Sequence, residues 1–279
     1  TLQNDVELYD GPDSNLAADK AKEADQVILV VGYTFEDEGE YISFDDNMQE
    51  SGEAGKLMGK EGIGGDRESL QLLPEDEALI QAVSSVNKNV VVVYVGGSAI
   101  NMNAWEKKVA GIVFAWYGGM QGGAALANVL YGKVNPSGKL PFSIARNDSD
   151  YPYFNPYTLK IEYGYYHGYT LFEKKNIEVA YPFGFGLSYT TFVYDILEIK
   201  TVELDKTGVL KASVHISNTG DVYGEEIVQL YVGFKNSKID LPVKLLRGFD
   251  KIGLEPGETK KVDFEVKIED LAWYDPEVK

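Results

Sequence analysis

Hydrophobic and polar positions in the first half of the chain follow two alternating patterns. Continuous apolar runs rich in β-branched residues predict buried strands, and they lie at residues 26–32, 89–97 and 111–116. Leu and Ala at helical spacing predict a helix over residues 15–24. A Pro followed by three acids predicts another helix over residues 74–83, because both features suit a helix N-terminus.

A further helix of small residues is predicted over residues 122–132, where Gly132 ends the pattern. Strands and helices that alternate in this way are typical of a mostly parallel sheet covered by helices on both faces. We therefore expect an α/β sandwich over residues 1–146, with its N-terminal part incomplete.

The second half of the chain has a different pattern. Short stretches of alternating apolar and polar residues, separated by turn residues, are typical of an all-β, immunoglobulin-like sandwich. These strands are predicted at residues 209–216, 226–232 and 261–266. We expect the sandwich over residues 193–279, after an ordered connecting segment rich in Tyr, Pro and Gly over residues 147–192.

Composition excludes several classes of function. Lys and Arg number 26 against 44 Asp and Glu, which gives a net charge of −18 and disfavours nucleic-acid and anionic-membrane partners. The chain has no Cys, and its two His, His167 and His215, lie far apart, so we expect no disulfide, metal site or cofactor. No apolar run approaches the length of about 20 residues that spans a membrane. We expect the chain to begin inside a longer protein, and both cytoplasmic and secreted or periplasmic locations stay open.

The strongest local signal for chemistry is an acidic stretch directly after the first predicted strand. Glu36, Asp37, Glu38 and Glu40 lie in a segment without Lys or Arg, at the end of a strand where open α/β sheets place ligands. One interpretation is a solvated acidic loop, and the ligand spacing of a calcium loop is absent. The other is a general acid, since neighbouring like charges raise the pKa of a carboxyl group.

Several segments, taken together, resemble one family. They are Glu36-Asp37-Glu38-Gly39, Gly65-Asp66-Arg67-Glu68-Ser69-Leu70, Asn135-Pro136-Ser137-Gly138-Lys139-Leu140-Pro141, Tyr163-Gly164-Tyr165-Tyr166-His167-Gly168-Tyr169, Pro182-Phe183-Gly184-Phe185-Gly186-Leu187-Ser188-Tyr189-Thr190, Asn218-Thr219-Gly220, Gln229-Leu230-Tyr231-Val232, Leu246-Arg247-Gly248-Phe249 and Pro256-Gly257-Glu258. Their order and spacing over nearly the whole chain resemble the C-terminal part of glycoside hydrolase family 3 enzymes, the β-glucosidases and their relatives. The strings at residues 136–141 and 183–189 are the most specific.

The resemblance implies a division of labour between domains. Family members combine a TIM-like barrel that carries a nucleophilic Asp, an α/β sandwich that carries a general acid/base Glu, and often a fibronectin type III-like domain. This chain resembles the last two, so the barrel is expected on the same precursor or on a partner chain. Ser149-Asp150-Tyr151 is similar to the family's nucleophile motif but falls where the family has a connecting loop, so we assign it no catalytic role.

The resemblance also implies which residues act. The family's acid/base Glu precedes a Gly, which carries the role to Glu38, with Glu36 and Glu40 as alternatives. In many members that Glu-Gly pair directly precedes an Asp-Arg pair. Here an insertion-like stretch separates it from Asp66 and Arg67, which are expected to position the loop.

The implied function is part of a retaining, exo-acting β-glycosidase, with β-glucosidase as the first expectation. Its substrate would be a β-linked oligosaccharide or an aryl or alkyl glycoside. One alternative is a non-catalytic carbohydrate-binding or interaction module, which the many Tyr residues and the sandwich scaffold favour. The other is a purely structural fragment. Whether the chain forms a homo-oligomer is left open.

Overall fold

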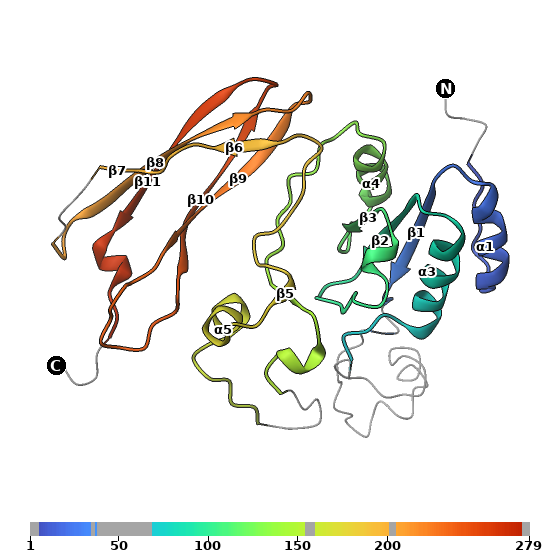
Figure 1. Ribbon diagram of the computed structural model, residues 1–279, viewed down its shortest axis with the longest axis horizontal. Coiled ribbons are helices and arrows are strands. Elements are labelled where there is room, and N and C mark those ends of the chain that lie inside the picture. Colours follow the sequence, from blue (N-terminus) through green and yellow to red (C-terminus); the bar gives the residue numbers. More distant parts are fainter. Residues whose placement is uncertain (1–5, 35–36, 38–68, 154–159, 201–204, 275–279) are drawn as a thin grey trace, which may run out of the picture. The chain divides into compact units, whose positions relative to one another are not determined.

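The computed structural model describes residues 6–34, 37, 69–153, 160–200 and 205–274. The chain folds into two compact units, which are described separately (Figure 1). Unit 1 comprises Thr1–Gly123 and Ile144–Glu162, and unit 2 comprises Ala124–Ser143 and Tyr163–Lys279. The domain limits expected after residues 146 and 192 stay predictions, because the division into units does not follow single cuts along the chain.

Unit 1 contains a parallel sheet, as the alternation of strands and helices predicted. Its strands are β1 (Val27–Gly32), β2 (Val90–Val95) and β3 (Gly111–Phe114), and they lie in that order. Val27 is in register with Val90, and Val91 with Gly111. β2 is buried on both faces, since consecutive side chains along it are inaccessible to solvent.

Two helices of unit 1, α1 (Ser14–Glu23) and α3 (Pro74–Val86), lie side by side next to β1 (Figure 1). α1 begins at Asp13, whose carboxylate accepts a hydrogen bond from the amide of Asn15 at 2.9 Å. α3 begins with Pro74, whose missing N–H costs nothing in the first turn. After α3, the Asn87 side chain donates to the Ala21 carbonyl at 2.8 Å and so ties the end of one helix to the other.

β1 differs from the expectation of a fully buried strand. Leu29 and Val31 are buried, whereas Ile28 and Val30 are 44% and 61% exposed. β1 is the edge strand of this sheet within the described residues, and only one of its faces is covered there. A continuous run of Val, Ile and Leu predicts the strand itself but does not predict how many of its faces are covered.

Shorter elements connect and follow the strands. η2 (Glu106–Lys108) lies between β2 and β3, and α4 (Gly122–Leu130), which continues into unit 2, β4 (Ile144–Ala145) and η3 (Asp148–Asp150) come after β3. α4 confirms the predicted small-residue helix, and Gly132 follows it with a φ of +68°, which glycine adopts without strain. Among the residues that the structure describes, no helix is long and apolar enough to cross a membrane.

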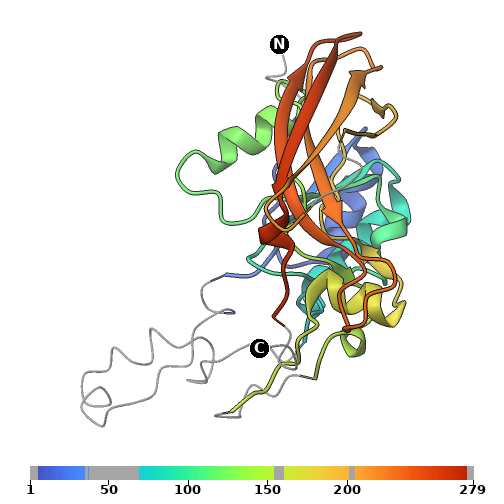
Figure 2. The ribbon, with the colours of Figure 1, turned by 90° about the vertical axis from the view of Figure 1, so that its left-hand side faces the viewer.

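Unit 2 is built around two antiparallel sheets, as predicted. One pairs β9 (Gly224–Val232) with β10 (Leu245–Leu254), and the other joins β6 (Phe192–Tyr194), β7 (Glu198–Ile199), β8 (Val209–Asn218) and β11 (Thr259–Lys267). The long strands run alongside one another in Figure 2. The core of the sandwich consists of Val214, Ile216, Val228, Leu254 and Val262.

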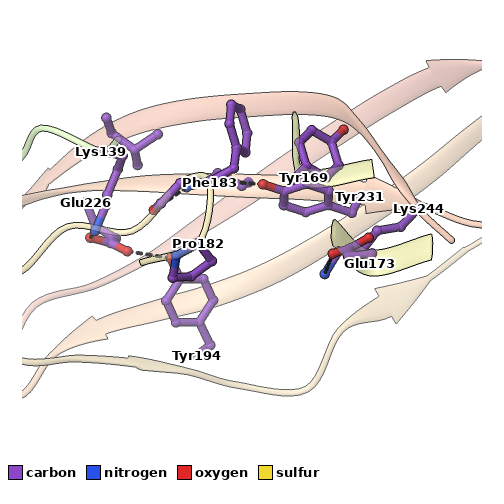
Figure 3. Close-up of a pocket in the computed structure, with 12 residues that line it drawn as sticks. Lys139, Tyr169, Glu173, Pro182, Phe183, Tyr194, Glu226, Tyr231 and Lys244 are labelled. Carbon is purple, nitrogen blue, oxygen red and sulfur yellow. Dashed lines mark hydrogen bonds and ion pairs between the residues drawn. The ribbon is translucent and has the colours of Figure 1, made fainter. Parts of the chain in front are cut away.

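Several elements of unit 2 were not predicted, among them β10 and a short helix. β10 has a register shift between Leu246 and Gly248, and of its residues only Leu254 is buried, so it lacks a clean alternating pattern. α5 (Gly168–Lys175) is a short helix within the aromatic segment, followed by β5 (Val179–Tyr181), and η4 (Ile268–Leu271) comes after the last strand. α5 forms part of the wall of a pocket (Figure 3).

Candidate functional site

The five residues to which the sequence assigns catalytic or loop-positioning roles lie outside the described residues. They are Glu36, Glu38, Glu40, Asp66 and Arg67. Their assignment therefore stays a prediction. The structure does describe the two ends of the segment that carries them, and those ends define where the segment starts and finishes in unit 1.

The first end lies directly after β1. The Thr34 amide and hydroxyl both donate to one carboxylate oxygen of Asp37, at 2.8 and 2.9 Å, and the Asp37 amide donates to the Thr34 carbonyl at 3.1 Å. These bonds form a tight turn at the carboxyl end of the strand. The acidic stretch thus leaves the sheet from the edge at which open α/β sheets bind ligands.

The second end returns to the same place. The Tyr33 hydroxyl donates to the carbonyl of Gln71, which brings the residues on either side of the segment together. The Leu70 carbonyl accepts from the Asn101 amide at 2.7 Å, and the Leu70 amide donates to the Asp148 carboxylate at 3.3 Å. Asp37 and Gln71, which lie on either side of residues 38–68 in the sequence, are therefore both held at the carboxyl end of β1.

Asp76, in the first turn of α3, links this edge to the helix. Its carboxylate accepts a hydrogen bond from the Gly32 amide at 3.0 Å. Burial raises the pKa of Asp76 above its ordinary value, although the Gly32 amide opposes the shift, and the charges of Glu75 and Asp37 add to it. The sequence around Asp76 predicts only an acid at a helix N-terminus, and no local signal indicates its bond to the strand.

The nucleophile-like string Ser149-Asp150-Tyr151 has a local structural role. Asp150 forms a reciprocal capping box with Asn147 and accepts from the Asn147 amide at 3.0 Å. The Tyr151 hydroxyl accepts from the amide of Ala145 at 2.9 Å. These side chains hold the turn after β4, and their hydrogen bonds are those of a stable loop.

The two most specific strings of the sequence lie next to each other in unit 2. The Leu140 amide donates to the Phe185 carbonyl and the Gly184 amide donates to the Leu140 carbonyl, both at 2.8 Å. A Cβ atom on Gly186 would lie 2.1 Å from the Gly138 carbonyl oxygen, so the close approach requires glycine. The strings are thus recognisable because their backbones pair closely.

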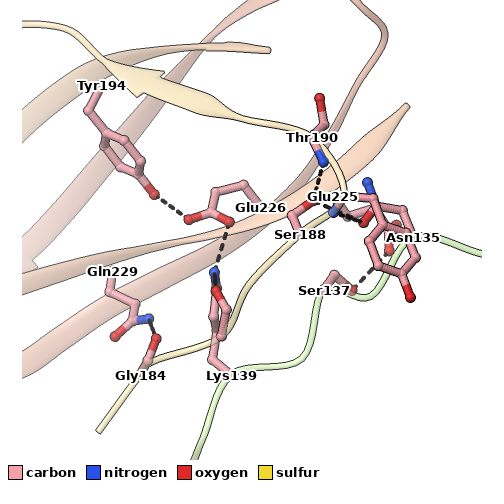
Figure 4. A network of polar contacts seen from close by, with 12 residues as sticks. Asn135, Ser137, Lys139, Gly184, Ser188, Thr190, Tyr194, Glu225, Glu226 and Gln229 are labelled. Carbon is pink, nitrogen blue, oxygen red and sulfur yellow. Dashed lines mark hydrogen bonds and ion pairs between the residues drawn. The ribbon is translucent and has the colours of Figure 1, made fainter. Parts of the chain in front are cut away.

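Asn135 connects these strings to the sandwich (Figure 4). Its side-chain oxygen accepts from the Ser188 hydroxyl at 2.9 Å and the Tyr189 amide at 2.8 Å. Its side-chain nitrogen donates to the Tyr223 carbonyl at 3.0 Å. One amide side chain therefore satisfies groups from three parts of unit 2.

Lys139 makes the second connection in Figure 4. Its ammonium group lies 3.0 Å from the Glu226 carboxylate and donates to the Gly186 carbonyl at 2.9 Å. The Tyr194 hydroxyl donates to the other Glu226 oxygen at 2.8 Å. Burial raises the pKa of the Tyr194 phenol, and the adjacent Glu226 carboxylate raises it further. The side chains of Lys139 and Glu226 are only 14% and 11% exposed, so this ion pair is largely removed from water.

Comparison with known proteins assigns the family. Residues 8–189, well over half of the chain, match the glycosyl hydrolase family 3 C-terminal domain. The chain belongs to this family. Residues 226–279 match the fibronectin type III-like domain, in agreement with the sandwich of unit 2. The fold class predicted from the sequence, an α/β sandwich followed by a fibronectin type III-like sandwich, is confirmed.

Relatives of this family 3 C-terminal domain include enzymes with assigned activities. A beta-glucosidase of Bacteroides ovatus is 42% identical over 76% of this chain, and a beta-xylosidase of Formosa agariphila is 34% identical over 94%. The crystal structure of a beta-D-glucoside glucohydrolase from Trichoderma reesei matches 98% of this chain with a TM-score of 0.83 at 30% identity. The chain spans 30%, 33% and 38% of the length of these three proteins, about a third of each.

Proposed function

We propose that this chain is the C-terminal part of a retaining, exo-acting β-glycosidase that hydrolyses terminal β-linked sugars. The family 3 match over residues 8–189 carries the proposal. The substrate would be a β-linked oligosaccharide or an aryl or alkyl glycoside. Glucose is the expected terminal sugar and xylose the second candidate, because the relatives include beta-glucosidases and a beta-xylosidase.

The proposed chemistry needs two carboxyl groups. In retaining hydrolysis they lie about 5–5.5 Å apart, one as the nucleophile and one as the general acid/base. A TIM-like barrel, on the same precursor or on a partner chain, supplies the nucleophilic Asp. This chain supplies Glu38, which protonates the leaving oxygen and then takes a proton from the attacking water.

The position of the acidic segment supports this role for Glu38. The described residues on either side of the segment lie at the carboxyl end of β1, where the Asp37 turn and the bond from Tyr33 to Gln71 hold them. The segment holds Glu36, Glu38 and Glu40 with no Lys or Arg among them, and like charges favour the protonated form of a carboxyl group, as a proton donor near neutral pH requires. Glu36 and Glu40 are the alternative donors, and Asp66 and Arg67 position the segment, with Arg67 binding carboxylates through its two-pronged guanidinium.

The decisive experiment compares Glu36→Ala, Glu38→Ala and Glu40→Ala in the complete, barrel-containing enzyme. Glu38→Ala is expected to lower kcat/KM for an alkyl β-glucoside by about 10²–10⁴, the usual contribution of general acid/base catalysis. It should have a much smaller effect on formation of the glycosyl-enzyme from a dinitrophenyl β-glucoside, whose leaving group needs no proton. Azide should restore turnover of that substrate. The same pattern in Glu36→Ala or Glu40→Ala would move the role to that residue.

A second measurement tests the division of labour. The isolated 279-residue chain should not hydrolyse an aryl β-glucoside, because it supplies one of the two required carboxyl groups. Addition of the barrel should restore hydrolysis. Robust turnover by the chain alone would contradict the proposal.

A further inference from the structure

Unit 2 encloses a pocket of about 330 Å³, and none of the residues that line it lies in the acidic segment (Figure 3). Its walls come from α5, from the string around Phe183 and from strands β6 and β9. The volume lies near the lower end of the range of about 300–1,000 Å³ that small-molecule pockets occupy. It suits a single ring with its substituents better than a long chain.

One part of the wall is aromatic. Tyr169 and Phe183 are stacked, with ring centres 4.9 Å apart and planes at 30°, and Tyr231 meets Tyr169 edge-on at 6.1 Å. The Tyr169 hydroxyl is held by the Leu246 amide at 3.0 Å, and the Tyr231 hydroxyl donates to the Gln229 side chain at 2.7 Å. The rings are therefore fixed in place and offer a rigid apolar surface.

The polar part of the wall consists of two ion pairs. Lys139 pairs with Glu226 at 3.0 Å, and Lys244 pairs with Glu173 at 2.9 Å. The four charges sum to zero, so the lining does not select for an anion or a cation. Each pair presents a carboxylate acceptor next to an ammonium donor.

Glu173 has an unfilled acceptor. Its Oε1 atom faces Lys244, whereas its Oε2 atom is buried and accepts no hydrogen bond from the described residues. A buried acceptor without a donor is costly, about 1–3 kcal/mol and more for a charged group. If the partly exposed Glu173 carboxylate turns toward the pocket when a ligand binds, a ligand hydroxyl group can donate to Oε2 and remove this cost.

We propose that this pocket binds one neutral sugar ring. A pyranose has C–H faces that pack on aromatic rings and a rim of hydroxyl groups that both donate and accept. The pocket combines the rigid Tyr169–Phe183 wall with two ion pairs and the unfilled, buried acceptor of Glu173. The proposal does not depend on Glu38, since binding here needs no catalytic carboxylate.

The test is a titration of the full 279-residue chain with methyl β-D-glucopyranoside, followed by NMR of the Tyr ring signals and by calorimetry. Saturable binding with shifts at Tyr169 and Tyr231 is expected. Glu173→Gln keeps the size of the side chain and removes the charged acceptor, so it should weaken binding about tenfold or more. Glu265→Gln is the matched control, because Glu265 forms an exposed ion pair with Lys211 outside the pocket. It should leave the affinity unchanged.

A comparison of probes tests the predicted neutrality. Glucose 6-phosphate should bind no more tightly than the methyl glucoside, because the lining carries no net positive charge. Absence of saturable binding to the wild-type chain, equal affinity in Glu173→Gln, or a preference for the phosphate would overturn the proposal. Each of these is read in the isolated chain, whereas the acid/base role of Glu38 is read from hydrolysis by the complete enzyme. The two proposals can therefore fail separately.

Discussion

Asn218 of unit 2 and strand β1 of unit 1 differ in how completely the residues around them satisfy or cover them. In unit 2, Asn218 is fully buried and all of its side-chain capacity is used: it accepts from Thr190 and Gly220 and donates to the carbonyls of Val222 and Leu254. In unit 1, β1 leaves Ile28 and Val30 in contact with solvent. Asn218 is thus satisfied within unit 2, whereas β1 is covered on only one face within the described residues of unit 1.

The most family-specific parts of this sequence are therefore not the parts to which the catalytic role is assigned. The most specific strings, around Lys139 and Gly186, form close backbone pairs and a buried ion pair in unit 2. The proposed acid/base lies instead in a segment whose only local signal is its charge. A motif is distinctive where backbone geometry leaves few acceptable residues, which is a property of packing before it is a property of catalysis.

The largest effect is expected from Asn218→Asp. The new carboxylate would face the carbonyls of Val222 and Leu254, where the amide now donates at 2.9 and 3.0 Å. A buried charge without a partner should destabilise unit 2 by about 4 kcal/mol at neutral pH. Hydrogen exchange of the β8 and β9 amides measures this change. The loss should shrink at acidic pH, where the carboxyl group is protonated.

Asn236→Asp provides the control for Asn218→Asp. Asn236 is exposed, and its substitution by Asp makes the same chemical change, an amide group replaced by a carboxyl group. Its effect should stay within about 0.5 kcal/mol. If the two variants exchanged at equal rates, Asn218 would not hold the sandwich as its hydrogen bonds indicate.

The next effect compares two ion pairs within unit 2. Lys139→Met is expected to cost about 3 kcal/mol, because it leaves the largely buried Glu226 carboxylate without its cationic partner. Lys211→Met removes the partner of Glu265 from a pair whose side chains are more than half exposed, so it should cost less than about 1 kcal/mol. Urea unfolding with hydrogen exchange of β9 as the readout separates the two. Equal costs would mean that the largely buried Lys139–Glu226 pair stabilises unit 2 no more than the exposed Lys211–Glu265 pair does.

A smaller effect separates the two faces of β1. Val31→Thr places a hydroxyl group on the buried face and should cost about 2 kcal/mol in unit 1. Val30→Thr makes the same chemical change one residue earlier, on the exposed face, and should stay within about 0.5 kcal/mol in the isolated chain. Thermal unfolding of both variants measures the difference. A cost of 2 kcal/mol for Val30→Thr would show that this face is covered in solution.

The sequence predicted most of the fold because periodicity reports local structure well. The strands at residues 26–32, 89–97 and 111–116 are found as β1, β2 and β3, and three strands of the sandwich are found as β8, β9 and β11. α5 escaped prediction because it is a short helix inside a segment rich in Tyr, Pro and Gly, where the helical spacing of Tyr165, Tyr169 and Phe172 did not stand out. β10 escaped because its bulge and its exposed positions disrupt alternation.

The site was less accessible to prediction than the fold. Asp37 and Tyr33 are local to β1, but the bond from Tyr33 to Gln71 joins residues far apart in the chain, and no spacing rule foretells it. The same holds for Asp76 and the Gly32 amide. Charge patterns indicate where carboxylates gather, whereas the partner that selects one of them is set by tertiary structure.

The smallest expected effect is a change in how the stability of unit 1 depends on pH, and it tests the contact between Asp76 and the Gly32 amide. The folded state raises the pKa of Asp76 above its ordinary value of 3.8, chiefly through burial. The folded protein therefore holds a proton that the unfolded chain has already lost, and unit 1 should lose stability as pH rises from 3.8 through the raised pKa. Asp76→Asn keeps an oxygen for the Gly32 amide and cannot ionise, so it should remove this slope and change stability by less than about 1 kcal/mol. Urea unfolding at a series of pH values, followed by tryptophan fluorescence, measures the slope. Glu75→Gln, in the same helical turn, should leave most of it in place, and a slope that persisted in Asp76→Asn would assign the pH dependence to another group.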